Sequence, residues 1–144
     1  MHFTSATEHQ NTVVLDTNIV LDAFVFDDPA ARPLKIALAS HQLQWMATKA
    51  MRDELARVLA YPKVTPRMAY YQVSAEHVLA QFDGQAMLVD TAPKAAVTCK
   101  DPDDQKFIDL AVAHKALLLS KDKAVLCMKK RLSALDVKAQ VAIE

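Results

Sequence analysis

Two short apolar runs, each followed at once by polar or acidic side chains, constrain the fold of this chain most strongly. Residues 13–15 (Val-Val-Leu) precede Asp16, and residues 117–119 (three leucines) lead into Ser120 and Asp122. Apolar runs of this length are typical of strands buried on both faces of a parallel sheet, and ligand sites in such sheets lie at the carboxyl ends of the strands. A buried carboxylate needs a partner. Two of them from distant parts of the chain therefore suggest a shared cation in a metal-dependent site.

The rest of the chain alternates between strand and helix patterns. Strands are predicted at residues 12–15, 43–47, 87–89, 116–119 and 137–143, and helices at residues 18–24, 29–40, 48–60, 66–72, 74–85, 103–115 and 123–132. This alternation indicates an α/β fold with a mainly parallel sheet. The 144 residues suffice for one domain with a substantial core. We predict a flexible leader over residues 1–11 and a single domain over residues 12–144.

Composition excludes several classes of protein. Seventeen basic and seventeen acidic side chains cancel, so any affinity for phosphate must be local. The only glycine is Gly84, whereas nucleotide-binding loops need several glycines at fixed positions. The two cysteines and five histidines show no spacing typical of a disulfide scaffold or a zinc site. No apolar run approaches the roughly 18 residues of a membrane helix and no secretory pattern is present, so we expect a cytoplasmic protein without a membrane partner.

Glu54 is unusual because it lies on the apolar stripe of its predicted helix. It follows Met51 by three residues and precedes Val58 by four, which places all three on one helix face. An inward Glu needs a partner, so a functional role competes with that of a flanking Glu that reaches water. The other acids considered are interpreted as surface or turn charges: Asp22, Asp27, Asp28 and Asp109.

Asp104 also points along an apolar stripe, because it lies three residues before Phe107. An Asp at a helix start is commonly a cap. Asp101 or Asp103 could cap this helix equally well, which leaves Asp104 open to either catalysis or capping. Asp122 carries the same ambiguity for the helix that follows it.

A divalent cation would explain why Asp16, Glu54, Asp104 and Asp122 converge. Without one, carboxylates brought together repel one another and their pKa values rise. Mg²⁺ and Mn²⁺ prefer oxygen ligands. Asn18 and Ser120 flank two of these acids and could orient a carboxylate, although local capping accounts for them equally well.

These residues resemble the PIN domain family. The resemblance rests on Val-Val-Leu-Asp16-Thr-Asn18, the helical Glu54, Asp104 opening Phe-Ile-Asp-Leu-Ala, and Leu-Leu-Leu-Ser120-Lys-Asp122. More narrowly, residues 99–107 look like the branch that contains toxins of toxin–antitoxin systems. The resemblance implies a three-layer α/β/α sandwich and a Mg²⁺- or Mn²⁺-dependent ribonuclease. It also implies an RNA substrate, an antitoxin protein as partner and a homodimer.

By position, the resemblance makes Asp16, Glu54, Asp104 and Asp122 the acidic metal ligands, assisted by Asn18 and Ser120. Our hypothesis is that metal held by Asp16 and Asp104, helped by Glu54 and Asp122, activates water for in-line attack on an RNA phosphodiester. Cations interleaved with these acids could form a positive rim that binds phosphate: Lys49, Arg52, Lys100, Lys106, Lys121 and Lys123.

Four other interpretations of these acids compete with this one, and the first two fit poorly. A phosphatase of the haloacid dehalogenase type needs a second Asp where this chain has Asn18, and a receiver-type domain fits poorly with a helical Glu54. A catalytically silent PIN-like module that binds RNA or protein would keep the same residues. Acids that serve only as caps and surface charge would not converge in the structure.

Overall fold

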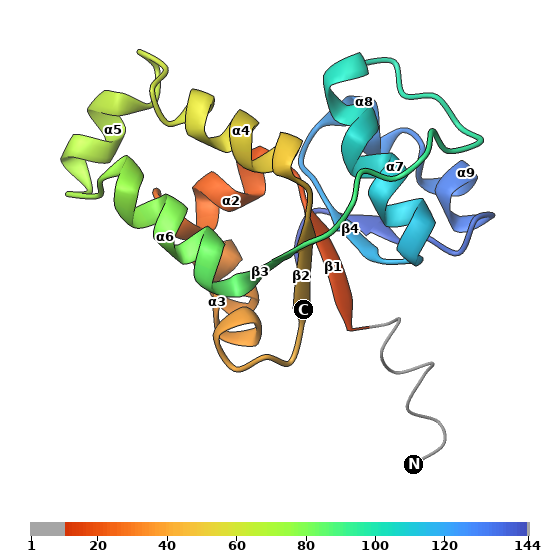
Figure 1. Cartoon of the computed structure of the whole chain (residues 1–144), viewed down its shortest axis with the longest axis horizontal. Coiled ribbons are helices and arrows are strands. Elements are labelled where there is room, and N and C mark those ends of the chain that lie inside the picture. Colours follow the sequence, from red (N-terminus) through yellow and green to blue (C-terminus); the bar gives the residue numbers. More distant parts are fainter. Residues whose placement is uncertain (1–10, 144) are drawn as a thin grey trace.

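The computed structural model describes residues 11–143 and contains one five-stranded sheet (Figure 1). The predicted leader, residues 1–11, lies almost entirely outside the described residues. The strands are β1 (Thr12–Leu15), β2 (Gln44–Ala47), β3 (Ala86–Leu88), β4 (Leu117–Leu119) and β5 (Ala139–Gln140). They are all parallel and follow the order β3-β2-β1-β4-β5. Strand β1 is therefore central, with β2 and β4 as its neighbours.

Helices cover both faces of this sheet. They are α2 (Thr17–Phe24), α3 (Arg32–Ala39), α4 (Lys49–Val58), α5 (Thr65–Tyr70), α6 (Ala75–Gln85), α7 (Gln105–His114), α8 (Lys123–Leu126) and α9 (Lys129–Ser133), with the short 3₁₀ helices η1 (Pro29–Ala31) and η2 (Pro102–Asp104). Helices α2 to α6 lie on one side of the sheet and α7 to α9 on the other (Figure 1). Right-handed crossovers produce this division. From β1 to β3 each new strand is added toward one edge of the sheet, whereas β4 and β5 are added toward the other edge, so the connecting helices lie on opposite faces. The predicted three-layer α/β/α architecture is confirmed.

The core explains why the strand sequences are apolar throughout. Val13, Val14, Leu118 and Leu119 are fully buried, because helices pack against both faces of the central strands. Strand β2 contributes Trp45, whose ring is sandwiched by aromatic side chains of α2 and α6. Within residues 11–143, no helix is both long and apolar enough to cross a membrane.

Several predicted elements are shorter or more divided than expected; the helix predicted at residues 103–115, for example, divides into η2 and α7. The helix predicted at residues 29–40 divides into η1 and α3, because Pro33 lacks an amide hydrogen and is tolerated only in the first turn. The helix predicted at residues 123–132 divides into α8 and α9 around the buried Met128. The strand predicted at residues 137–143 is limited to Ala139–Gln140, because β5 is an edge strand whose only neighbour is the three-residue β4.

Candidate metal centre

The site begins where β1 and β4 end side by side. Leu15 pairs with Leu119 in the sheet, so Asp16 and Ser120 leave the sheet at the same edge. The chain passes from β1 to β2 on one side and returns to β4 on the other. This is a topological switch point, where open α/β sheets form their ligand-binding crevices.

Asp16 is held rigidly at this edge by two hydrogen bonds. Its Oδ1 accepts from the backbone N–H of Asn18 at 3.1 Å, which caps α2. Its Oδ2 accepts from the hydroxyl of Ser120 at 2.7 Å. Asp16 is buried, and this burial raises the pKa of its carboxyl above the ordinary value.

Ser120 connects two acids through one fully buried hydroxyl group. Its Oγ donates to Asp16 and also accepts from the backbone N–H of Asp122 at 3.0 Å. Asn18 contributes its backbone N–H to Asp16, while the residue as a whole is exposed. In this structure Asn18 contacts Asp16 through its main chain, and a supporting role for its side chain stays a prediction.

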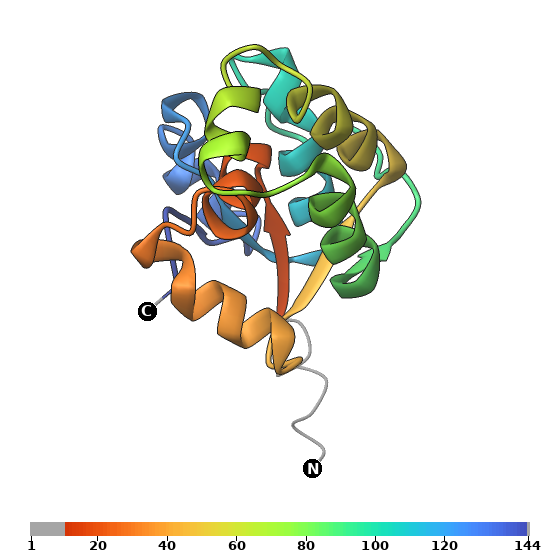
Figure 2. The ribbon, with the colours of Figure 1, turned by 90° about the vertical axis from the view of Figure 1, so that its left-hand side faces the viewer.

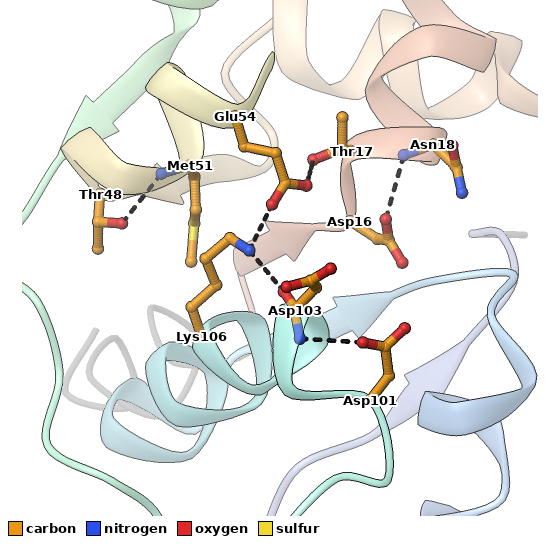
Figure 3. Close-up of polar contacts among 9 residues, drawn as sticks. All are labelled: Asp16, Thr17, Asn18, Thr48, Met51, Glu54, Asp101, Asp103 and Lys106. Atoms are coloured by element: carbon orange, nitrogen blue, oxygen red, sulfur yellow. Dashed lines mark hydrogen bonds and ion pairs between the residues drawn. The ribbon is translucent and has the colours of Figure 1, made fainter. Parts of the chain in front are cut away.

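Asp104 lies at the junction of η2 and α7, where a separate residue supplies the cap. The side chain of Asp101 accepts from the backbone N–H of Asp103 at 3.0 Å (Figure 3). The side chain of Asp104 makes no capping hydrogen bond. It is only 7% exposed, and no donor among residues 11–143 reaches its buried Oδ2. This orphaned oxygen is the feature that most directly indicates a cation-binding position.

Asp122 approaches Asp104 from the start of α8. Its Oδ1 accepts from the backbone N–H of Ala124 at 2.9 Å. Burial, the hydrogen bond with Asp122 and the charge of Asp16 raise the pKa of Asp104 to about 8. The hydrogen bond from Asp104 and that from Ala124 lower the pKa of Asp122. These opposite shifts favour a proton on Asp104, the more deeply buried carboxyl, over one on Asp122 in the metal-free protein.

Asp16, Asp104 and Asp122 form what we call the acidic triad. One oxygen from each lies within 4.8 Å of the other two. Three converging carboxylates offer the all-oxygen ligand set that Mg²⁺ and Mn²⁺ prefer. The three residues of the triad come from separate segments of the chain. If they served only as helix caps, there would be no reason for their side chains to converge.

Glu54 faces the triad from α4 but is not one of its three members. Its Oε2 accepts from the hydroxyl of Thr17 at 2.6 Å, and its Oε1 forms an ion pair with Lys106 (Figure 3). Its side chain is 19% exposed. It lies close enough to Asp16 for its charge to raise the pKa of that carboxyl. A role for Glu54 as a direct metal ligand stays a prediction.

The predicted positive rim is largely neutralised by neighbouring acids. Four of its six cations form ion pairs: Lys49 with Asp53, Arg52 with Asp83, Lys106 with Glu54, and Lys121 with Asp22. Within the described part of the chain, only Lys100 and Lys123 of this set have no such ion pair. Phosphate binding at this surface therefore depends on fewer free charges than the sequence indicated.

Two acids that the sequence analysis interpreted as surface charges have structural partners. Asp22 is buried and forms an ion pair with Lys121; its spacing of three residues from Ile19 could have placed it on the inner face of α2. Asp109 accepts from the backbone N–H of Ala95 at 2.9 Å and from the side chain of Gln105 at 2.8 Å. It therefore anchors the long segment between β3 and η2, and no local sequence signal indicates that contact.

Comparison with known families agrees with this geometry. The family model described as PIN domain matches residues 12–124, a range that includes the whole triad and Glu54. No curated protein matches the chain at a significant level.

Proposed function

The chain belongs to the PIN domain family, whose members are generally nucleases, and from that premise we propose that it is a Mg²⁺- or Mn²⁺-dependent endoribonuclease. The observation that supports this proposal most directly is the acidic triad, with one oxygen of each residue within 4.8 Å of the others. An arrangement of this kind suits hydrolysis of RNA phosphodiester bonds.

The residues of the triad fit a hard divalent cation. All its donors are oxygens, and the buried Oδ2 of Asp104 has no donor among residues 11–143. A cation bound by Asp16, Asp104 and Asp122 would supply charge neutralisation for a phosphodiester and lower the pKa of a bound water. Ser120 holds the Asp16 carboxylate in one orientation through its 2.7 Å hydrogen bond. Such an orienting contact keeps a ligand set preorganised.

Glu54 is the fourth acid of the proposed site, at its periphery. Thr17 follows Asp16 directly and donates to Glu54, so the two carboxylates are tied to the same turn. Direct ligation by Glu54 would require its ion pair with Lys106 to break. In the arrangement described here, Lys106 supplies a positive charge beside the acids and limits their mutual repulsion.

The cellular role that we propose is that of the toxin of a toxin–antitoxin pair. Support for it comes from residues 99–107, which resemble that branch of the family. An antitoxin protein and a second copy of the chain are the partners that this role implies, and the cytoplasm is the corresponding location.

The decisive experiment is cleavage of mixed single-stranded RNA by the purified protein with Mn²⁺ or Mg²⁺. EDTA should abolish cleavage, as should Asp16→Asn and Asp104→Asn, because each removes a ligand of the proposed cation. Asp90→Asn is the matched control, since Asp90 is exposed and lies outside the triad. It should cleave like the wild type.

Two results would contradict the proposal in different ways. Cleavage that persists in Asp16→Asn and Asp104→Asn would exclude the triad as the catalytic site. Binding of Mn²⁺ without cleavage of any RNA would favour a catalytically silent module that works through RNA or protein binding.

A further inference from the structure

A cleft of about 510 Å³ adjoins the acidic triad on the side of α2. Two of its lining residues are chain neighbours of the triad: Asn18, whose backbone holds Asp16, and Lys121, which lies between Ser120 and Asp122. Its volume falls within the range of sites for small organic groups. The cleft and the proposed metal centre therefore share the segments at the ends of β1 and β4.

One wall of the cleft consists of flat aromatic and guanidinium surfaces. The Arg67 guanidinium lies 3.6 Å from the centroid of the Phe26 ring. The Tyr71 ring lies 6.2 Å from Phe26 and is 39% exposed. Arg67 and Tyr71 come from α5 and the residue that follows it, and Figure 2 shows α5 lying over α2 on this side. Both side chains remain accessible.

The four charged side chains that line the cleft cancel, but Arg67 forms no ion pair with an acid of the described residues. Lys121 is compensated by the buried Asp22, and Asp28 adds a further negative charge. Arg67 is the remaining cation. It therefore offers one local contact for a phosphate beside a planar wall.

We propose that this cleft holds one unpaired nucleotide of the RNA substrate, next to the phosphodiester at the acidic triad. The base stacks on the wall formed by Tyr71 and Arg67, and Arg67 also approaches the neighbouring phosphate. Aromatic rings and guanidinium planes recognise unstacked bases in this manner. The inference rests on the proposed nuclease function and adds a site for one nucleotide, which must be unpaired because a base within a duplex cannot stack on this wall.

The test is fluorescence anisotropy of a labelled single-stranded RNA octamer in EDTA, which separates binding from cleavage. Tyr71→Ala and Arg67→Gln should each raise Kd on the order of 10-fold, within the range for losing one stacked base. Tyr71→Phe should bind like the wild type because it keeps the ring. The matched controls are Tyr61→Ala and Arg57→Gln, which replace exposed residues outside the cleft.

Several results would overturn this inference. They are unchanged binding by both cleft variants, equal losses in the controls, or competition by an RNA duplex as strong as that by a single strand. Arg67→Gln replaces an exposed side chain, so the test holds even where Tyr71→Ala fails to fold.

A parallel cleavage assay with Mn²⁺ keeps the two proposals separate. If the wild type cleaves RNA but the cleft variants bind it normally, the nuclease proposal stands and the nucleotide site is refuted. Binding that depends on Tyr71 and Arg67 without any cleavage would support the nucleotide site and refute the nuclease. Absence of both binding and cleavage would refute both.

Discussion

Replacing Asp104 with asparagine should stabilise the metal-free protein at alkaline pH. Burial, the hydrogen bond with Asp122 and the charge of Asp16 raise the pKa of Asp104 from its ordinary value of 3.8 to about 8. Between these two values, the folded protein holds a proton on this carboxyl that the unfolded chain has released. Because the folded state binds more protons, the free energy of unfolding falls as the pH rises through this window.

The size of the effect follows from the same pair of carboxyls. A rise from 3.8 to about 8 is roughly four pKa units, and at about 1.4 kcal/mol per unit the upper limit is near 6 kcal/mol. The lowered pKa of Asp122 acts in the opposite direction, because the same hydrogen bond stabilises its charged form. The net gain in Asp104→Asn at pH 8.5 should therefore be positive but smaller than this limit, on the order of a few kcal/mol, and each kcal/mol should raise Tm by roughly 3 °C in a domain of this size.

Urea denaturation in EDTA at pH 5 and pH 8.5 measures this difference. Asp104→Asn should gain clearly less at pH 5 than at pH 8.5, because at pH 5 only the first part of the window between 3.8 and about 8 has been crossed. The exposed Asp90→Asn should match the wild type at both values. A gain of equal size at both pH values, or a loss at pH 8.5, would refute the account of the buried proton. Saturating Mg²⁺ should stabilise the wild type more than the variant, because only the wild type retains all three carboxylates of the triad.

Three further substitutions test single contacts. Lys106→Met should lower the free energy of unfolding by about 1 to 2 kcal/mol, because it leaves the partly buried Glu54 carboxylate without its cation; urea denaturation measures this. Ser120→Ala should weaken Mn²⁺ binding by about 10- to 100-fold in isothermal titration calorimetry, because Asp16 loses its 2.7 Å hydrogen bond. Asp109→Ala should lower stability by about 1 to 2 kcal/mol and accelerate amide hydrogen exchange at Ala95, whose N–H it holds.

Each of these substitutions has a control that replaces the same type of residue at a position outside the contact being tested. Lys49→Met removes a lysine that is 83% exposed and should change stability by less than about 0.5 kcal/mol. Ser133→Ala lies outside the triad and should leave Mn²⁺ affinity unchanged. Asp90→Ala should leave exchange at Ala95 unaltered. Equal effects in a substitution and its control would remove the specific contact as the explanation.

The order and type of the main elements could be predicted because the hydrophobic patterns are strong. Buried parallel strands must be apolar on both faces, and residues 13–15 and 117–119 satisfy this with no polar interruption. The predicted boundaries are wrong where a single proline or the length of a neighbouring strand limits an element that the hydrophobic pattern favoured. Pro33 ends the continuity of a helix that the apolar spacing favoured, and the pairing of β5 with only three residues of β4 limits its length.

The candidate site could be predicted in its residue types but not in its pairing. Strand ends and helix starts have local signals, and these placed Asp16, Asp104 and Asp122 at one edge of the sheet. The partners of Glu54 and Lys121 depend on contacts between segments far apart in the chain. Such contacts have no local signature, which is why the rim of free cations was overestimated.

Capping and metal binding, which the sequence presented as alternatives for these acids, are compatible uses of one carboxylate. An ionised carboxylate has about four lone-pair positions, and a cap occupies one. Asp16 caps α2 with Oδ1 and Asp122 caps α8 with Oδ1, so each cap fixes the direction in which the remaining lone pairs point. Asp104 is released from capping by Asp101, and its Oδ2 has no donor among residues 11–143. The helix starts at this sheet edge therefore orient the acids of the site, and a substitution such as Asp122→Asn that preserves the cap should separate the two roles by retaining the fold while weakening Mn²⁺ binding.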